Sequence, residues 1–154
     1  MESLTTIFAK YPGTDKDTLH SYTALYEKLL ETKRLQVTTV LEVGVRDGSS
    51  LKAWKDYFPN ATHVIGIDDG SEQGVWKPDI AGLEILIADT TKPATVTKAL
   101  QRFSHGFFDL IIDDGYHRAF AQATTYGTLR SFLAPGGLYV IEDIESIEEA
   151  LDMQ

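Results

Sequence analysis

The fold of this chain is decided at residues 41–48, which read LEVGVRDG. The residues before the first glycine, from Thr38 onward, are mostly apolar or β-branched, as in a buried β-strand. Gly44 lets the backbone turn sharply where that strand ends, and Gly48 relieves crowding where a helix begins. The stretch therefore predicts a strand, a glycine loop and a helix arranged around a ligand.

Apolar runs like this one recur at regular intervals along the chain. Polar residues do not alternate with the apolar ones, which is typical of parallel strands covered on both faces. Because helical patterns separate the runs, we predict an α/β protein with a Rossmann-like doubly wound parallel sheet of about five strands in three layers. The expected strands are Thr38–Val45, Thr62–Asp68, Leu83–Asp89, Phe108–Asp113 and Gly137–Glu142.

The expected helices are segments in which apolar residues recur at helical spacing. Thr14 or Asp17 is expected to cap the first helix. The sequence APGG at residues 134–137 is a strong helix breaker and is expected to end the last helix. The four predicted helices are Asp17–Leu35, Ser49–Tyr57, Pro93–Phe103 and Arg118–Leu133.

The length of 154 residues is enough for one domain with its own core. We divide residues 1–154 into an N-terminal helical leader (1–36), a Rossmann-like core (37–144) and a short acidic C-terminal helix (145–154). Ligands of such sheets bind at the carboxyl ends of the strands. We therefore expect the functional residues at that edge of the sheet.

The amino-acid composition limits which kinds of molecule the protein can bind. The chain has 14 Lys and Arg against 23 Asp and Glu, a net charge of −9, which disfavours nucleic acid and anionic membranes. No apolar run approaches the ~20 residues that cross a bilayer, and no secretion signal is expected. The sequence has no cysteine, which excludes disulfides and thiolate metal ligands. We expect a cytoplasmic protein that acts on a small molecule.

Acidic residues mark the ends of the first three expected strands. Glu42 precedes the first glycine, and Arg46 stands where the dinucleotide fingerprint would require glycine. An acid here suits a cationic ligand, such as the α-amino group of methionine, better than a pyrophosphate. Asp68 follows about twenty residues later, where an acid that holds ribose hydroxyls belongs, and Asp89 is placed to contact an adenine. The alternative is a glycine turn that serves backbone geometry alone.

A second acidic cluster stands at the ends of the fourth and fifth strands, which read DDGYH at 113–117 and ED at 142–143. If these strands are neighbours, Asp114, Glu142 and Asp143 converge. Crowded carboxylates need a proton or a cation between them, and oxygen ligands suit Mg²⁺. His117 is a candidate base for a hydroxyl proton. The alternatives are helix-capping aspartates, solvated acids and a structural histidine.

The glycine loop and its acids resemble those of the class I S-adenosylmethionine-dependent methyltransferases. That resemblance implies that S-adenosylmethionine binds at the carboxyl ends of the first four strands. The residues assigned to the cofactor are Glu42, Gly44, Gly48, Ser49, Asp68, Asp89 and Asp113.

The resemblance becomes narrower over the second cluster. Together with LAPGGLYVIED at 133–143, YPGTDK at 11–16 and SLKAWKDYFPNA at 50–61, the DDGYH motif is similar to the metal-dependent macrolide sugar O-methyltransferases of the mycinamicin and macrocin type. The similarity runs from about residue 11 to residue 143. It implies Mg²⁺ at Asp114, Glu142 and Asp143, with His117 as the general base, and Tyr116 replaces the more usual serine.

Two further predictions concern the N-terminal leader and the edge of the sheet formed by the fifth strand. The resemblance would let Lys16, His20 and Tyr22 close over the cofactor or the substrate, whereas the helical spacing of Tyr22 and Tyr26 favours a core role for these two. The family's C-terminal antiparallel hairpin is expected to be absent. An uncovered fifth strand invites pairing with another chain, so we expect a homodimer or a higher homo-oligomer.

The expected function is that of an enzyme, a Mg²⁺-dependent methyltransferase that uses S-adenosylmethionine to methylate a hydroxyl of a sugar or a small metabolite. One alternative is a non-catalytic or minimal S-adenosylmethionine-binding or assembly module. The other is an NAD-dependent oxidoreductase, which Arg46 opposes.

Overall fold

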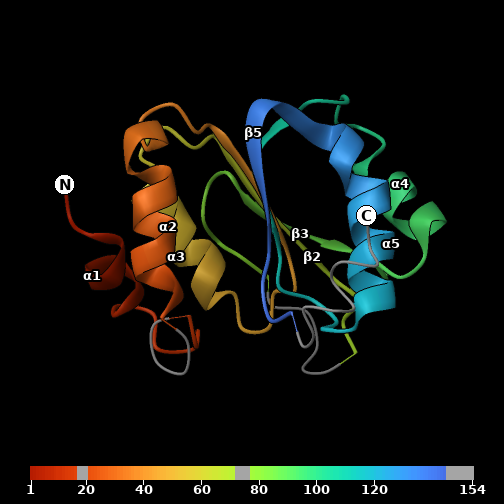
Figure 1. Ribbon diagram of the computed structural model, residues 1–154, viewed down its shortest axis with the longest axis horizontal. Coiled ribbons are helices and arrows are strands. Elements are labelled where there is room, and N and C mark those ends of the chain that lie inside the picture. The colour runs from red at the N-terminus through yellow and green to blue at the C-terminus, as the bar shows by residue number, and fades with distance from the viewer. Residues whose placement is uncertain (17–20, 72–76, 145–154) are drawn as a thin grey trace.

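The computed structural model describes residues 1–16, 21–71 and 77–144. Within these ranges, five strands form a single sheet and helices cover both of its faces (Figure 1). The predicted α/β architecture of three layers is confirmed. Asp17, His20 and the expected C-terminal helix at 145–154 lie outside the described residues.

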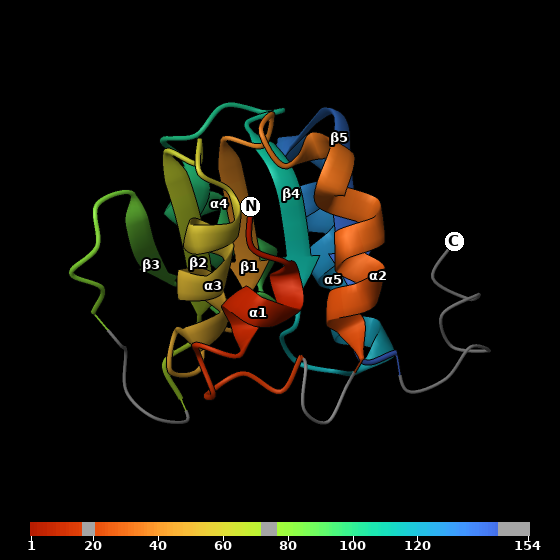
Figure 2. The same ribbon diagram turned by 90° about the vertical axis from the view of Figure 1, so that its left-hand side faces the viewer.

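All neighbouring strands of the sheet are parallel, in the order β3-β2-β1-β4-β5 (Figure 2). The direction of winding changes between β1 and β4, and ligands of such sheets bind at the carboxyl ends of the strands near that change. The predicted pairing of the fourth strand with the fifth is also confirmed. The strands are β1 Thr39–Val43, β2 His63–Asp68, β3 Leu83–Ile87, β4 Phe108–Asp113 and β5 Leu133–Ile141.

The last strand differs from its prediction. β5 begins at Leu133 instead of Gly137, so the expected breaker lies inside the strand. Leu133 pairs with Phe108 and Leu138 pairs with Leu110, which makes the APGG sequence a bulge in the β4–β5 ladder. Gly136 adopts a φ of 77°, a conformation that glycine reaches at little cost. The preceding helix therefore stops earlier than the breaker.

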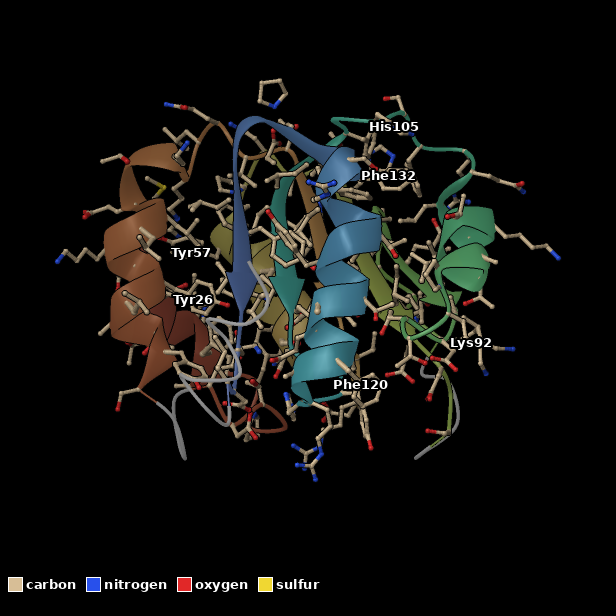
Figure 3. All side chains as sticks on the ribbon, turned by 45° about the vertical axis from the view of Figure 1, so that its right-hand side comes forward. Tyr26, Tyr57, Lys92, His105, Phe120 and Phe132 are labelled. Atoms are coloured by element: carbon tan, nitrogen blue, oxygen red, sulfur yellow. The ribbon has the colours of Figure 1, made fainter. Side chains whose placement is uncertain are left out.

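The helices divide between the two faces of the sheet (Figures 1 and 3). One face carries α1, α2 and α3, and the other carries α4 and α5. Their bounds are α1 Leu4–Phe8, α2 Tyr22–Leu30, α3 Ser49–Tyr57, α4 Pro93–Leu100 and α5 Ala119–Leu129, with 3-10 turns at Glu31–Lys33 and Arg130–Phe132.

The predicted bounds of α3 are confirmed, whereas three other predicted helices are shorter than expected at one or both ends. Ser21 is the N-cap residue of α2, so Thr14 does not cap it. The short helix α1 is an addition to the predicted set. Among the described residues, none of the helices is long and apolar enough to cross a membrane.

Two apolar layers enclose the sheet. The layer beneath α1, α2 and α3 centres on the fully buried Trp54, whose ring makes edge contacts with Phe8 and Tyr26 at centroid distances of 5.0 Å. Figure 3 shows Tyr26 on this side of the sheet and Phe132 on the side of α5, in the second layer. The helices of the leader thus share an apolar core with the α/β unit.

Candidate functional site

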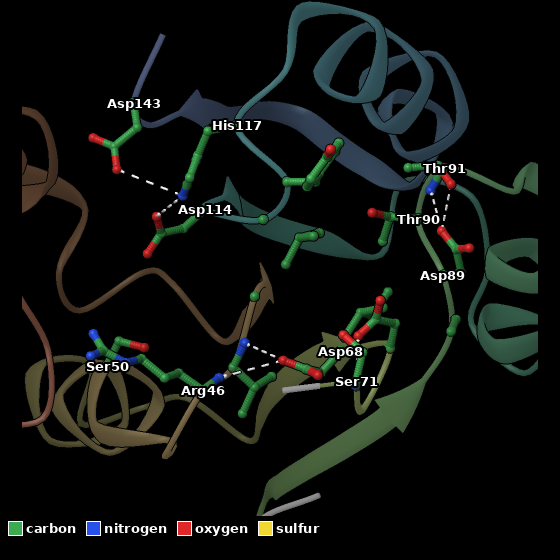
Figure 4. A pocket seen from close by; sticks show the side chains of 18 of the residues that line it. Arg46, Ser50, Asp68, Ser71, Asp89, Thr90, Thr91, Asp114, His117 and Asp143 are labelled. Carbon is green, nitrogen blue, oxygen red and sulfur yellow. Dashed lines mark hydrogen bonds and ion pairs between the residues drawn. The ribbon is translucent and has the colours of Figure 1, made fainter. Parts of the chain in front are cut away.

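A cavity of about 760 Å³ lies at the carboxyl ends of the strands, and six of the eleven predicted site residues line it (Figure 4). Its wall is formed by the glycine loop and by the residues that follow β2, β3, β4 and β5. Gly13, Thr14 and Asp15 of the leader complete the lining. A cavity of this size accommodates a nucleoside-sized ligand.

Gly44 is required by the close approach of two strand ends. Its φ is 85°, and a Cβ atom there would lie 2.1 Å from the carbonyl oxygen of Asp114. Gly44 lines the cavity, whereas Gly48 and Ser49 lie behind it. Gly48 is the N-cap residue of α3 with a φ of 75°, and the Ser49 hydroxyl donates to Asp47. These two residues shape the loop from outside the cavity wall.

Asp68 and Asp89 stand at one end of the cavity (Figure 4). One carboxylate oxygen of Asp68 accepts the amides of Val45 and Arg46 at 2.9 and 3.4 Å. Asp89 accepts hydrogen bonds from Thr91 and pairs with the Lys92 ammonium at 2.9 Å. These hydrogen bonds, led by that from Thr91, lower the pKa of Asp89. Both acids therefore hold loop backbone and also present oxygen to the cavity.

Glu42 does not line the cavity, so the cofactor contact predicted for it stays a prediction. Side chains alternate along a strand, so Glu42 points to the face opposite that of Val43, toward α3 and the leader. It is fully buried, accepts the Ser50 hydroxyl at 2.8 Å and lies 3.3 Å from the Lys16 ammonium. Burial raises the pKa of Glu42 to about 7.

Asp113 is also buried outside the cavity. Its Oδ1 accepts the Gly115 amide at 3.4 Å, and among the described residues its Oδ2 has no hydrogen-bond partner. Burial raises the pKa of Asp113 to about 7, with a further contribution from the charge of Asp114. Asp113 therefore reaches the cavity only through the turn that it holds.

A cluster of potential cation ligands occupies the other end of the cavity (Figure 4). His117 Nε2 lies 3.8 Å from Asp143 Oδ2 and 4.0 Å from Asp114 Oδ1. One ligand atom from each residue lies within 4.8 Å of the others. The two carboxylates fit a hard divalent cation that keeps several waters, and the imidazole lies beside them as the predicted base. The structure thus brings together two of the three predicted metal ligands and the predicted base.

Glu142, the third predicted ligand, is buried beside that cluster and engages a different cation. It accepts hydrogen bonds from the Lys16 ammonium at 2.7 Å and from the Tyr26 hydroxyl. Lys16 Nζ also contacts Asp114 Oδ2 at 2.5 Å. Burial alone would lower the pKa of Lys16, but Glu42, Asp114 and Glu142 together raise it well above its usual range. The Lys16 side chain therefore stays protonated at neutral pH.

The leader reaches the acidic cluster by two further contacts. The Tyr22 hydroxyl donates to Asp143 Oδ1 at 2.6 Å, and Tyr22, at the start of α2, holds the Lys16 carbonyl through its amide. The predicted core role of Tyr26 is confirmed, and its hydroxyl also donates to Glu142. Closing of Lys16 and Tyr22 over a ligand stays a prediction. The sequence motifs pointed to Lys16 but not to its partners Asp114 and Glu142, because these lie 98 and 126 residues further along the chain.

A smaller groove of about 240 Å³ runs between α2 and the end of β5. Its wall includes Tyr22, Leu25 and Leu29, and it meets the main cavity at Asp143. Leu25 and Leu29 are exposed there, and β5 is an edge strand of the described sheet. The groove therefore offers apolar surface directly beside the cation ligands.

The architecture and the cavity place the chain in the Rossmann-like class of methyltransferase folds. No protein-family model matches the chain. Curated relatives are nevertheless clear. The chain is 35% identical over 141 residues to 8-demethyl-8-alpha-L-rhamnosyl tetracenomycin-C 2'-O-methyltransferase of Streptomyces olivaceus, covering 87% of this chain and 36% of that enzyme. It is 32% identical over 133 residues to mycinamicin VI 2''-O-methyltransferase of Micromonospora griseorubida, covering 82% and 32%.

A solved structure gives the same result. The MycE methyltransferase of the mycinamycin pathway, in complex with Mg, SAH and mycinamycin VI, superposes with a TM-score of 0.78 at 29% identity, covering 92% of this chain and 39% of that one. The chain spans about a third of the length of the curated relatives it matches, 36% and 32% in the two cases above. It is homologous to one segment of the macrolide-type sugar O-methyltransferases, which confirms the resemblance predicted from its motifs.

Proposed function

We propose that this chain is the cofactor-binding and catalytic part of a Mg²⁺-dependent O-methyltransferase that uses S-adenosylmethionine to methylate a sugar hydroxyl. One observation carries the proposal. A single cavity has nucleoside-type acids, Asp68 and Asp89, at one end and a cation-ligand cluster with a histidine at the other. The sugar acceptor is inferred from the names of the relatives.

The donor end suits S-adenosylmethionine, which would supply an activated methyl group on sulfur. Asp68 is placed to bind the ribose hydroxyls and Asp89 to contact the adenine edge, while the missing Cβ of Gly44 lets the ligand approach the backbone. We assign Glu42, Gly48, Ser49 and Asp113 to the support of this loop.

The other end suits the acceptor. Asp114 and Asp143 would hold Mg²⁺ together with the predicted ligand Glu142, and the bound ion would acidify a nearby hydroxyl. His117 receives the hydroxyl proton at Nε2, where the carboxylates of Asp114 and Asp143 stabilise the imidazolium that forms. The cavity walls would align the hydroxyl with the methyl group, which lowers the barrier in addition to the proton transfer.

Three further expectations stay proposals. We propose that residues 1–36 and 37–144 act as one domain, because the leader both packs on Trp54 and lines the cavity. We propose a homo-oligomer that covers the β5 edge, which a clean monomer in sedimentation at micromolar concentration would contradict. The third proposal is the cytoplasmic location expected from the sequence.

Calorimetric titration of the full chain with S-adenosylhomocysteine and, separately, with NAD tests the cofactor assignment. We expect binding of S-adenosylhomocysteine and none of NAD. Binding of NAD alone would support the oxidoreductase. Binding of S-adenosylhomocysteine without methyl transfer to any rhamnosyl acceptor would support the non-catalytic module.

A further inference from the structure

We infer that Lys16 is a built-in counter-cation whose ammonium competes with the divalent cation for Asp114 and Glu142, and so sets the affinity of the site for metal. The inference rests on the proposed function for the metal site. It adds a residue that acts on that site from the leader.

The surroundings of Lys16 are those of a bound cation. Its side chain is 1% exposed, and its ammonium lies 2.5 Å from Asp114 Oδ2, 2.7 Å from Glu142 Oε2 and 3.3 Å from Glu42 Oε1. Three buried or half-buried carboxylates would repel one another strongly without a cation between them. Lys16 supplies that cation and bridges the three carboxylates when no metal is bound.

The ammonium and the proposed metal ion use the same ligands. Two of the three predicted metal ligands, Asp114 and Glu142, already bind Lys16. The two carboxylate oxygens of Asp114 serve different groups. Its Oδ2 contacts Lys16, while its Oδ1 faces the cluster of His117 and Asp143. A divalent ion bound to the same carboxylate repels the ammonium across a few ångströms. Full coordination by Glu142 requires Lys16 to withdraw from it.

Withdrawal of Lys16 changes the core as well as the leader. The Tyr26 hydroxyl donates to Glu142, and the Tyr26 ring lies 5.0 Å from the ring of Trp54. Movement of Glu142 toward a metal ion therefore alters the surroundings of Trp54. The sequence contains two tryptophans, so replacing Trp76 leaves Trp54 as a single fluorescent reporter.

The test is a titration with MgCl₂, in the Trp76→Phe background, of the unmodified site and of Lys16→Met. We expect Lys16→Met to bind Mg²⁺ about tenfold more tightly, because the competing charge is gone. Lys10→Met is the matched control, since it removes an exposed leader lysine that pairs with Glu2, and its Mg²⁺ affinity should not change. Unchanged or weaker binding by Lys16→Met overturns the inference.

A second measurement needs no variant. Amine-reactive labelling followed by mass spectrometry should find Lys16 protected without metal and several-fold more reactive with saturating Mg²⁺, while Lys10 reacts equally in both. Protection of Lys16 at saturating Mg²⁺ contradicts the competition. If no form binds Mg²⁺, the inference and the magnesium part of the proposed function fail together, whereas binding of S-adenosylhomocysteine would still support the donor site.

Discussion

The two ends of the cavity use acidic residues in opposite ways. At the donor end, Asp68 and Asp89 accept hydrogen bonds from nearby loop groups, so the carboxylates fix the shape of the wall. At the other end, Asp114 and Glu142 share the buried ammonium of Lys16, which comes from the leader. Local hydrogen bonds therefore fix the geometry of the donor end. The geometry of the other end depends on the Lys16 ammonium, with which a divalent cation would compete.

Removal of the proposed base His117 should have the largest effect and should leave the donor end intact. His117→Ala should reduce the rate of methyl transfer by about 100- to 10,000-fold, the usual contribution of a positioned base. The affinity of this variant for S-adenosylhomocysteine should stay within about twofold, because binding of that ligand involves no proton transfer to His117. Steady-state kinetics and calorimetry measure the two quantities. His105→Ala, an exposed histidine that packs on Phe132, is the control, and equal activity of both variants would refute the assignment.

The junction between the two ends is tested at Gly44. Gly44→Ala should lower the free energy of unfolding by about 3 kcal/mol or more, because a Cβ atom would meet the Asp114 carbonyl in a left-handed conformation. Gly136→Ala has a similar φ of 77° but open space around it, so it should cost only about 1 kcal/mol. Urea unfolding of both variants gives the difference, and equal losses would contradict the role of close approach.

The buried acid behind the junction makes stability depend on pH. Burial raises the pKa of Asp113 to about 7, so the folded state binds a proton that the unfolded state has released. Stability from this group is therefore complete below the unfolded pKa and falls as pH rises toward 7. We expect a loss of about 2–3 kcal/mol between pH 5 and pH 8 that Asp113→Asn reduces. Identical pH profiles for both proteins, measured by urea unfolding, would rule this out.

The smallest expected effect concerns Asp68, at the donor end of the cavity. Asp68→Asn should weaken binding of S-adenosylhomocysteine by about tenfold, the typical loss of a charged hydrogen-bond acceptor, and leave Mg²⁺ affinity unchanged. Asp79→Asn, at an exposed position away from the cavity lining, serves as the control in the same calorimetric titrations. A parallel loss of Mg²⁺ binding in Asp68→Asn would mean that the two ends are not independent.

Much of the fold followed from the sequence because continuous apolar runs and strand-end acids are local signals. The bulge in β5 did not, since APGG reads as a breaker until its pairing with β4 is known. The orientation of Glu42 was available from the alternation of side chains along β1, given that Val43 faces the cavity. The position of Lys16 was not, because it depends on how the leader packs against β4 and β5.

The proposed Mg²⁺-dependent methyl transfer is tested with a labelled methyl group on S-adenosylmethionine and a rhamnosyl tetracenomycin acceptor, in the presence of Mg²⁺ and of EDTA. We expect labelled product with Mg²⁺, its loss in EDTA and its recovery when Mg²⁺ is restored. Equal product with and without Mg²⁺, or no product from a chain that binds both S-adenosylhomocysteine and Mg²⁺, would contradict it.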